Sequence, residues 1–274
     1  MLGGGGMLGA NEVGMLRALI EEGVRPDLVV GTSVGAINGA AVAADPSLDA
    51  VTRLTEVWHG VADSDLYSGS ALRRVRHLAR TRTHVHPNEP LRGLLTEQFG
   101  DIAIEDLAVP FQCVAASIER AAEHWFDSGP LVDAVLASTA VPGVLPPVRI
   151  GNEHYLDGGL VNSIPVSRAV LLGARTIYVL QVGRIERPLA VPRRPWEVAT
   201  VAFEIARRHR FAHDMTTLPD DVAVHVLPTG AAEPPAYADL SALRYRDFSR
   251  VQERITAAYE ATLGYLRDPD PQAG

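Results

Sequence analysis

The sequence predicts an α/β fold in which helices pack in layers on a mostly parallel sheet. Three observations predict it. Short apolar runs at Asp27–Val30 and Thr176–Val182 have the length and composition of buried strands. Amphipathic stretches at Asn11–Glu22 and Phe248–Leu266 have the apolar spacing of helices. The two kinds of segment alternate along the chain, which is the order that builds parallel strands connected by helices.

The remaining elements follow from caps and turn residues, taken in chain order. Further helices are expected at 36–44, Leu48–Trp58, Ala71–Arg80, Glu89–Phe99, Val132–Ala137, from Pro165 to Leu172, and at Trp196–Phe211. Ser47, Ser70 and Asn88 are the expected N-caps of the second, third and fourth of these. Further strands are expected at Pro110–Glu119, Glu123–Asp127, Gly151–Leu156 and Asp221–Leu227. Prolines and small residues predict loops at Ala137–Val148 and Thr229–Asp239.

Composition excludes several classes of protein. The formal net charge is −8 and every basic residue is an arginine, a balance that argues against binding to nucleic acid. The single cysteine, Cys113, lies in an apolar run and is expected to be a buried structural thiol. The sequence contains neither a signal-peptide pattern nor an apolar run that spans a bilayer. We therefore expect a soluble, cytoplasmic protein; its oligomeric state is not predicted.

We expect one domain over residues 1–267, with a helical cap insertion at about 63–99 and a loose tail at 268–274. From Arg73 to Arg92 the insertion carries six arginines and one acid. A solvated helix face is the simpler interpretation, and a basic surface that makes peripheral contact with anionic membranes is the alternative. His84 and His86 have no companion ligands nearby in the sequence, so a loop is expected there and no metal site.

Gly31-Thr32-Ser33-Val34-Gly35 follows a predicted strand and precedes a predicted helix. In that context G-x-S-x-G is typical of a nucleophile elbow, a tight turn that exposes the serine hydroxyl at a helix N-terminus. The string itself arises by chance in about one chain of ten with this composition. A glycine-rich turn capped by Ser33 is therefore the alternative that the motif alone leaves open.

The first nine residues read Met-Leu-Gly-Gly-Gly-Gly-Met-Leu-Gly and contain Gly4-x-Gly6-x-x-Gly9. A dinucleotide-binding motif of this kind requires an acidic residue at the end of the second strand. Here that strand continues into Gly31-Thr32-Ser33, which disfavours dinucleotide binding. A phosphate-binding P-loop is excluded because no Gly-Lys-Ser/Thr follows. Successive glycine amides can instead turn inward as an anion nest. With the amide of Val34, those of Gly4, Gly5 and Gly6 are candidate donors to an oxyanion.

Asp157-Gly158-Gly159 closes a predicted strand and supplies a candidate base for Ser33. A carboxylate in a dry site gains proton affinity, which suits it to accept the serine proton. The alternative for this motif is a strand-ending turn. A Ser-Asp-His triad would need a downstream histidine. The candidates, His209, His213 and His225, lie within a predicted helix, at its end and within a predicted strand, where structural roles are expected.

Four of these segments together resemble the motifs of the patatin-like phospholipase family and occur in the same order as in that family. They are the Gly4–Gly9 loop, Gly31-Thr32-Ser33-Val34-Gly35, the Ala137–Val148 loop and Asp157-Gly158-Gly159. The resemblance covers about residues 1–182. It implies a three-layer α/β/α sandwich, a Ser33–Asp157 dyad and an oxyanion hole at the Gly4–Gly6 loop. It further implies hydrolysis of acyl esters of lipids through an acyl-enzyme, without a cofactor. The motif glycines of this pattern are Gly9, Gly31, Gly35, Gly158 and Gly159.

The chain departs from the family pattern at two places. Leu8 stands where the family usually has a basic residue, and only Met1 and Leu2 precede the glycines, where the family has a full first strand. We expect a strand this short to hold the glycine loop less firmly. These departures keep open a second hypothesis, a catalytically silent lipid-binding or regulatory protein on the same fold.

Overall fold

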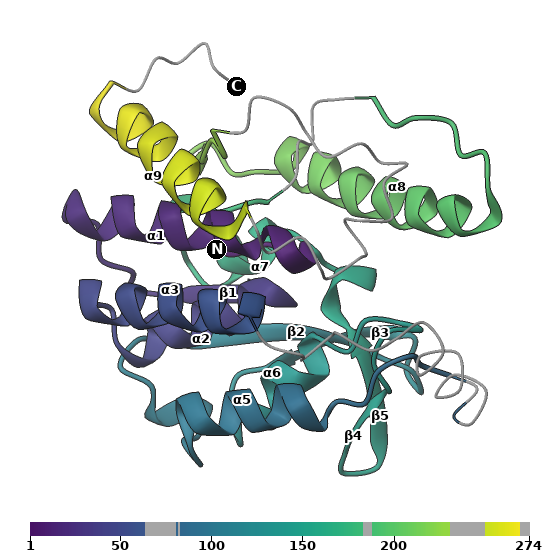
Figure 1. Cartoon of the computed structure of the whole chain (residues 1–274). Coiled ribbons are helices and arrows are strands. Elements are labelled where there is room, and N and C mark those ends of the chain that lie inside the picture. The colour runs from purple at the N-terminus through teal and green to yellow at the C-terminus, as the bar shows by residue number, and fades with distance from the viewer. Residues whose placement is uncertain (64–80, 82, 183–187, 231–249, 269–274) are drawn as a thin grey trace.

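A computed structural model describes residues 1–63, 81, 83–182, 188–230 and 250–268 (Figure 1). The centre of its sheet is the extended segment at Leu2, which lies between β1 (Val29–Thr32) and β6 (Thr176–Val179). The amide of Leu2 donates to the carbonyl of Val30 at 2.8 Å, and the amide of Gly3 donates to that of Leu180 at 2.9 Å. This short segment therefore pairs on both edges and joins the two halves of the sheet.

The sheet is mixed. β1 pairs in parallel with β2 (Phe111–Ser117), and β6 pairs in parallel with β7 (Ala223–Val226). β2 also pairs antiparallel with β3 (Ala122–Phe126) and with β5 (Glu153–Asp157). β5 in turn pairs antiparallel with β4 (Val148–Ile150). The α/β class is confirmed, and the antiparallel end makes the sheet less uniformly parallel than predicted.

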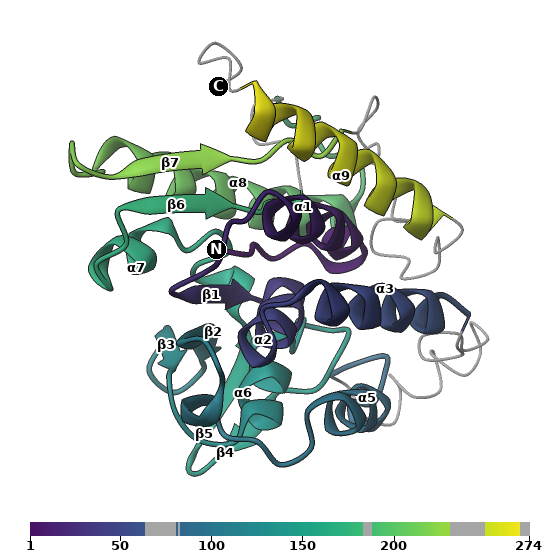
Figure 2. The same cartoon turned by 90° about the vertical axis from the view of Figure 1, so that its left-hand side faces the viewer.

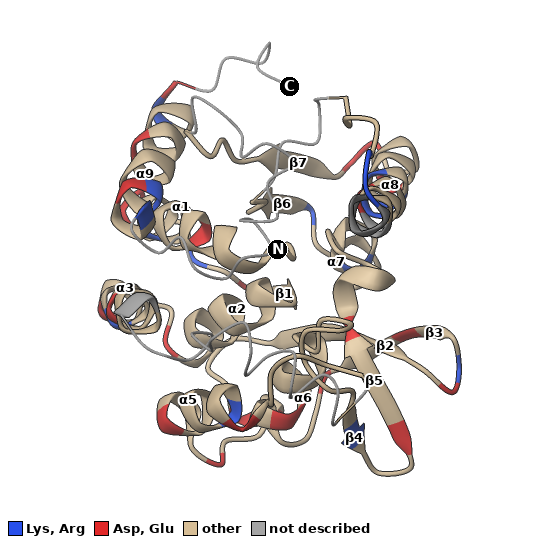
Figure 3. Cartoon of the chain, turned by 45° about the vertical axis from the view of Figure 1, so that its right-hand side comes forward, with Lys and Arg blue, Asp and Glu red and all other residues tan. Residues whose placement is uncertain are grey.

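Helices cover both faces of the sheet, which makes three layers (Figures 2 and 3). One face carries α1 (Ala10–Glu21), α2 (Val34–Ala44), α3 (Leu48–Asp63), α5 (Glu89–Phe99), α6 (Leu131–Ser138) and α9 (Val251–Arg267). The other face carries α7 (Val166–Leu171) and α8 (Pro195–Thr216). Short 3-10 turns lie at Gly6–Gly9, Ile104–Asp106 and Gly158–Leu160. The predicted α/β/α sandwich is therefore confirmed.

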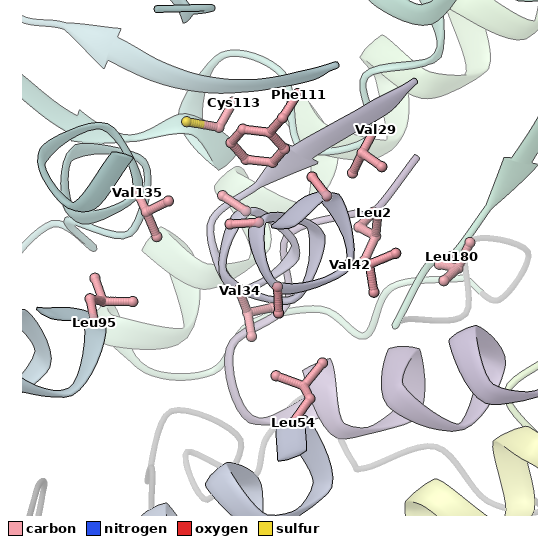
Figure 4. Close-up of a cluster of buried hydrophobic side chains, with 14 of the residues drawn as sticks. Leu2, Val29, Val34, Val42, Leu54, Leu95, Phe111, Cys113, Val135 and Leu180 are labelled. Atoms are coloured by element: carbon pink, nitrogen blue, oxygen red, sulfur yellow. The ribbon is translucent and has the colours of Figure 1, made fainter. Parts of the chain in front are cut away.

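The hydrophobic core has one cluster on each face of the sheet, because neighbouring residues of a strand point to opposite faces. Val29 packs in the larger cluster and Val30 in the smaller one. Figure 4 shows part of the larger cluster around α2, with Phe111 and Cys113 of β2 on one side and Leu54 of α3 on another. Cys113 is a buried free thiol, as expected from its apolar surroundings.

The predicted elements within the described residues are present, with shifted ends. α8 continues to Thr216, beyond the predicted Phe211. β4 replaces the end of the predicted Ala137–Val148 loop. The Ser47 hydroxyl accepts a hydrogen bond from the amide of Ala50 at 3.3 Å, as a cap does, whereas Asn88 precedes α5 without a side-chain bond. Among the helices of the described ranges, none is both long and apolar enough to cross a membrane.

The predicted cap insertion is described only in part. Residues 64–80 and 82, with the helix predicted at Ala71–Arg80 and most of the arginine run, lie outside the described residues. α5 is described, and its Leu91 and Leu95 are buried in the larger core cluster. Arg92 of that helix forms an ion pair with Asp133 of α6 at 2.7 Å. The tail beyond Asp268 and nearly all of the loop predicted at Thr229–Asp239 also lie outside the described residues.

Candidate active site

Ser33 stands at a strained turn between β1 and α2. Its backbone has φ 55° and ψ −123°, in a region that L-residues rarely adopt and that costs about 1–3 kcal/mol. Gly35 makes the turn sterically possible, because a Cβ at that position would lie 2.5 Å from the carbonyl oxygen of Leu2. The elbow predicted from the motif is therefore present, with the first turn of α2 pressed against the N-terminal segment.

Asp157 meets Ser33 from β5, which is separated from β1 by β2 in the sheet. It ends β5, where it is paired with Ala115 of β2, and its own amide donates to the carbonyl of Ala140 at 2.9 Å. The Ser33 hydroxyl donates to Oδ2 of Asp157 at 2.6 Å. Ser33 is 7% exposed and Asp157 is 4% exposed. The structure thus brings together, inside the protein, two residues that lie 124 positions apart.

The environment of Asp157 makes its carboxyl more basic than usual. Burial, which disfavours the charged form, raises the pKa of Asp157 from 3.8 to about 6. The hydrogen bonds from the Ser33 hydroxyl and from the amide of Gly159, the latter at 2.7 Å to Oδ1, act in the opposite direction. Near neutral pH the carboxyl is ionised and has a higher proton affinity than a carboxylate in water.

The glycine loop that begins the chain lies beside Ser33. A Cβ on Gly4 would be 3.4 Å from the Cβ of Ser33. The amide of Gly4, however, donates to the carbonyl of Ser163 at 2.9 Å, so it is already used. Among the described residues we find no acceptor for the amides of Gly5, Gly6 and Val34. These three amides, without Gly4, remain as candidate oxyanion donors.

The other motif glycines allow close packing around these segments. A Cβ on Gly31 would lie 2.5 Å from the carbonyl oxygen of Gly35. One on Gly158 would lie 2.2 Å from the carbonyl oxygen of Val114. Gly9 is similarly enclosed, since its Cβ would fall 2.3 Å from the side chain of Val34. Gly159 contributes its amide to Asp157.

An apolar pocket opens next to Ser33. Its empty volume is about 700 Å³, including the open solvent at its mouth. Apart from Ser33 and Thr139, the lining side chains of the described residues are apolar and none of them is charged. They come from the glycine loop, α2, α3, α5 and the segment after α6. Such a lining suits a hydrocarbon chain and disfavours a charged group, which would lose its hydration there.

Three contributors to the site were missed by the sequence analysis: the pocket, Ser138 and Asn38. The amide of Ser33 donates to the Ser138 hydroxyl at 2.9 Å. Asn38, fully buried in α2, bonds to the carbonyl of Gly9 at 3.0 Å. A polar residue inside the otherwise small and apolar 36–44 stretch was the available signal for Asn38. Ser138 carried no such signal: it lies in the loop predicted at Ala137–Val148, and nothing local connects its hydroxyl with the amide of Ser33.

The histidines considered for a triad lie on other elements. His209 and His213 are exposed on α8, and His225 of β7 is hydrogen-bonded through Nδ1 to the Tyr265 hydroxyl at 3.1 Å. None of the three lines the pocket beside Ser33. His84 and His86 belong to no group of three or more possible metal ligands in the part of the chain that the structure describes. The absence of a metal and of a cofactor remains a prediction.

The fold and the site define a class of protein: α/β/α sandwiches that present a serine, hydrogen-bonded to a buried carboxyl, on a strand–helix elbow beside an apolar pocket. Residues 1–170 match the family model of the patatin-like phospholipases. The chain belongs to the patatin-like phospholipase family, as the resemblance of its motifs indicated.

Several relatives are recorded. Over 189 residues the chain is 34% identical to a patatin-like phospholipase domain-containing protein, ZK370.4, of Caenorhabditis elegans, and covers 14% of it. Over 187 residues it is 33% identical to the lysophospholipase nte1 of Aspergillus terreus, and covers 12% of it. Each alignment includes 68% of this chain, so the relatives are far longer proteins. Among solved structures, VipD from Legionella pneumophila aligns over 97% of this chain and 66% of its own, with a TM-score of 0.43 and 12% sequence identity. No inference rests on this likeness.

Proposed function

We propose that this protein is a serine hydrolase that cleaves acyl ester bonds of lipids. The observation that carries the proposal is the 2.6 Å hydrogen bond from the Ser33 hydroxyl to the buried carboxyl of Asp157. A nucleophile in hydrogen-bond contact with a base is the arrangement that serine catalysis requires. The family and the names of its relatives, one of them a lysophospholipase, favour a lipid ester as the substrate.

The proposed reaction has two steps. In the first, Oγ of Ser33 forms a bond to the ester carbonyl carbon while its proton moves to Oδ2 of Asp157. The resulting oxyanion accepts hydrogen bonds from the amides of Gly5, Gly6 and Val34. The intermediate then breaks its bond to the leaving alcohol, which takes the proton from Asp157. In the second step water adds to the acyl-enzyme in the same way, and releases the fatty acid with Ser33 restored.

The raised pKa of Asp157, about 6, supports its role as the base in this reaction. A base whose pKa lies near or just below the working pH is still ionised, and it accepts a proton more effectively than a base whose pKa lies far below that pH. The apolar lining that the described residues give the pocket supports the orientation of the substrate, with the acyl chain inside and the polar head group toward solvent. The cytoplasmic location and the peripheral membrane contact expected from the sequence remain predictions.

The test is hydrolysis of p-nitrophenyl butyrate and of 1-palmitoyl lysophosphatidylcholine by the purified protein. We expect Ser33→Ala and Asp157→Asn each to lower kcat by about 10³-fold or more, since the two residues act as a unit. Ser117→Ala and Asp133→Asn are matched controls, because both residues lie outside the described contacts of the Ser33–Asp157 pair. We expect both controls to keep the rate within about threefold.

Three outcomes would contradict the proposal. Unchanged hydrolysis by Ser33→Ala would exclude Ser33 as the nucleophile. Loss of activity on replacing His209, His213 or His225 singly would point to a histidine triad. A folded wild-type protein that hydrolyses neither substrate and does not react with a fluorophosphonate probe at Ser33 would favour the silent lipid-binding alternative.

A further inference from the structure

We propose that Asn38, supported by the buried Glu12, is a positioning residue that holds the two halves of the oxyanion hole in register. The inference rests on the proposed function, because it concerns how the same site is kept in shape. Gly5 and Gly6 belong to the glycine loop, whereas Val34 is the first residue of α2. Some contact must fix these two segments relative to each other if their amides are to meet at one oxygen atom.

The side chain of Asn38 forms that contact. It lies five residues after Ser33 on α2 and is fully buried. Its Nδ2 donates to the carbonyl of Gly9, which ends the 3-10 turn Gly6–Gly9, at 3.0 Å. Gly6 and Met7 of this turn line the pocket. A single hydrogen bond therefore connects the nucleophile helix with the end of the loop that carries Gly5 and Gly6.

Two further hydrogen bonds fix the orientation of the Asn38 amide. Its Oδ1 accepts from the indole nitrogen of Trp58 at 3.1 Å, and since an indole only donates, this bond determines which end of the amide is oxygen. Trp58 belongs to α3 and forms part of the pocket wall. With Oδ1 held by Trp58, Nδ2 must face Gly9 and Glu12. The amide cannot flip without losing all three bonds.

Glu12 completes the network from α1. It is fully buried, and its Oε2 accepts from Nδ2 of Asn38 at 2.7 Å, while Oε1 has no partner among the described residues. Burial raises the pKa of Glu12 well above 4.5, against the opposing effect of the Asn38 bond. A neutral acceptor suffices to hold Asn38, and Glu12→Gln preserves it. An apolar residue would fill this position at lower cost.

The test compares kcat per active site, with active sites counted by titration with a fluorophosphonate, for hydrolysis of p-nitrophenyl butyrate. We expect Asn38→Ala to lower kcat by about 10- to 100-fold with KM within about threefold, because a loop displaced by a fraction of an ångström weakens the hydrogen bonds to the transition state. Asn38→Leu, which refills the volume, is expected to behave in the same way. Counting sites separates this effect from a loss of folded protein.

Two conservative variants serve as controls. Glu12→Gln keeps an acceptor for Asn38, and Ser117→Ala removes a buried hydroxyl that bonds to Glu153 outside this network, so both should keep kcat within about threefold. The lower limb of the pH–rate profile should stay near pH 6 in all variants, since the hydrogen bonds of Asn38 described above go to Gly9, Glu12 and Trp58 and not to Asp157.

The proposal is overturned if Asn38→Ala and Asn38→Leu keep the wild-type kcat per site. It is also overturned if Ser117→Ala loses as much as they do, because the loss would then follow from removing any buried polar side chain. Both results leave Ser33-dependent hydrolysis, and hence the proposed function, intact. A wild-type protein without Ser33-dependent hydrolysis overturns the proposed function, and this inference with it.

Discussion

The backbone amide of Ser33 donates to the hydroxyl of Ser138 at 2.9 Å, and both residues are buried. Ser138 ends α6, and two residues later the carbonyl of Ala140 accepts the amide of Asp157 at 2.9 Å. One short segment therefore holds the backbone of both members of the hydrogen-bonded pair. Without this bond the strained amide of Ser33 would be a buried donor with no acceptor.

Replacing Ser138 with alanine should impair both stability and catalysis. An unsatisfied buried amide costs about 1–3 kcal/mol, and relaxation of the turn would move Oγ of Ser33 away from Asp157. We expect Ser138→Ala to lower kcat per titrated active site by about 10-fold. Ser117→Ala is the control, because Ser117 is equally buried but bonds to Glu153 at 3.0 Å. Equal kcat values for the two variants would show that Ser138 has no role in positioning.

The buried carboxyl of Asp157 should destabilise the folded protein at neutral pH. The folded pKa of about 6 exceeds the ordinary value of 3.8, so the unfolded chain releases its proton first. Stability is therefore lost as pH rises from about 4 to about 6, by about 3 kcal/mol in total, and stays low above that range. Asparagine carries no such charge.

We accordingly expect Asp157→Asn to unfold at higher urea concentration than the wild type at pH 8, although it is inactive. The difference in the free energy of unfolding, up to about 3 kcal/mol, should shrink toward zero as pH falls through 6 to 4. Other ionisable groups affect both proteins alike and cancel in the comparison. A difference that grows at low pH would mean that Asp157 is stabilised in its charged form, contrary to our account.

Local patterns were enough to predict the elements around the site. The elbow at Ser33 follows from a glycine-flanked serine between an apolar run and a small-residue helix, and the turn after Asp157 follows from two glycines. Their contact across 124 positions has no local signal, and the order of the family's motifs was needed to pair them. The strand predicted at Gly151–Leu156 corresponds to β5, whereas β4 was not predicted, because it has only three residues and its place depends on pairing with β5.

A buried polar group near the site can be noticed in the sequence as a polar residue on the apolar face of a predicted helix. Glu12 occupies the same face of α1 as Leu16, Leu19 and Ile20, where an acid is out of place. Which partner satisfies such a residue depends on tertiary packing. The sequence therefore indicates that Glu12 is unusual but does not identify Asn38 as its partner.

The width of the pocket close to Ser33 should set the preference for acyl chain length. Ile37 lines the pocket one helical turn after Ser33, and it is half-buried. A tryptophan there fills part of the pocket. We expect Ile37→Trp to lower hydrolysis of the p-nitrophenyl palmitate ester by about 10-fold or more relative to the butyrate ester, because the longer chain loses its apolar contacts. Ile118→Trp, at a surface site with 47% exposure that does not line the pocket, should leave the ratio unchanged.

The packing of α9 on α1 depends on Gly14. α9 lies outside residues 1–170, the part of the chain that matches the family model. A Cβ on Gly14 would lie 2.1 Å from the carbonyl oxygen of Ile255, so alanine there must push the two helices apart. We expect Gly14→Ala to lower the free energy of unfolding by about 2 kcal/mol or more. Gly93→Ala in α5 is the control: its Cβ would meet no atom of the described residues within 4 Å, and the substitution should stabilise the protein by about 0.5–1 kcal/mol. Urea denaturation of both variants measures the difference, and equal stability of Gly14→Ala and the wild type would mean that α9 does not pack on α1 at this distance in solution.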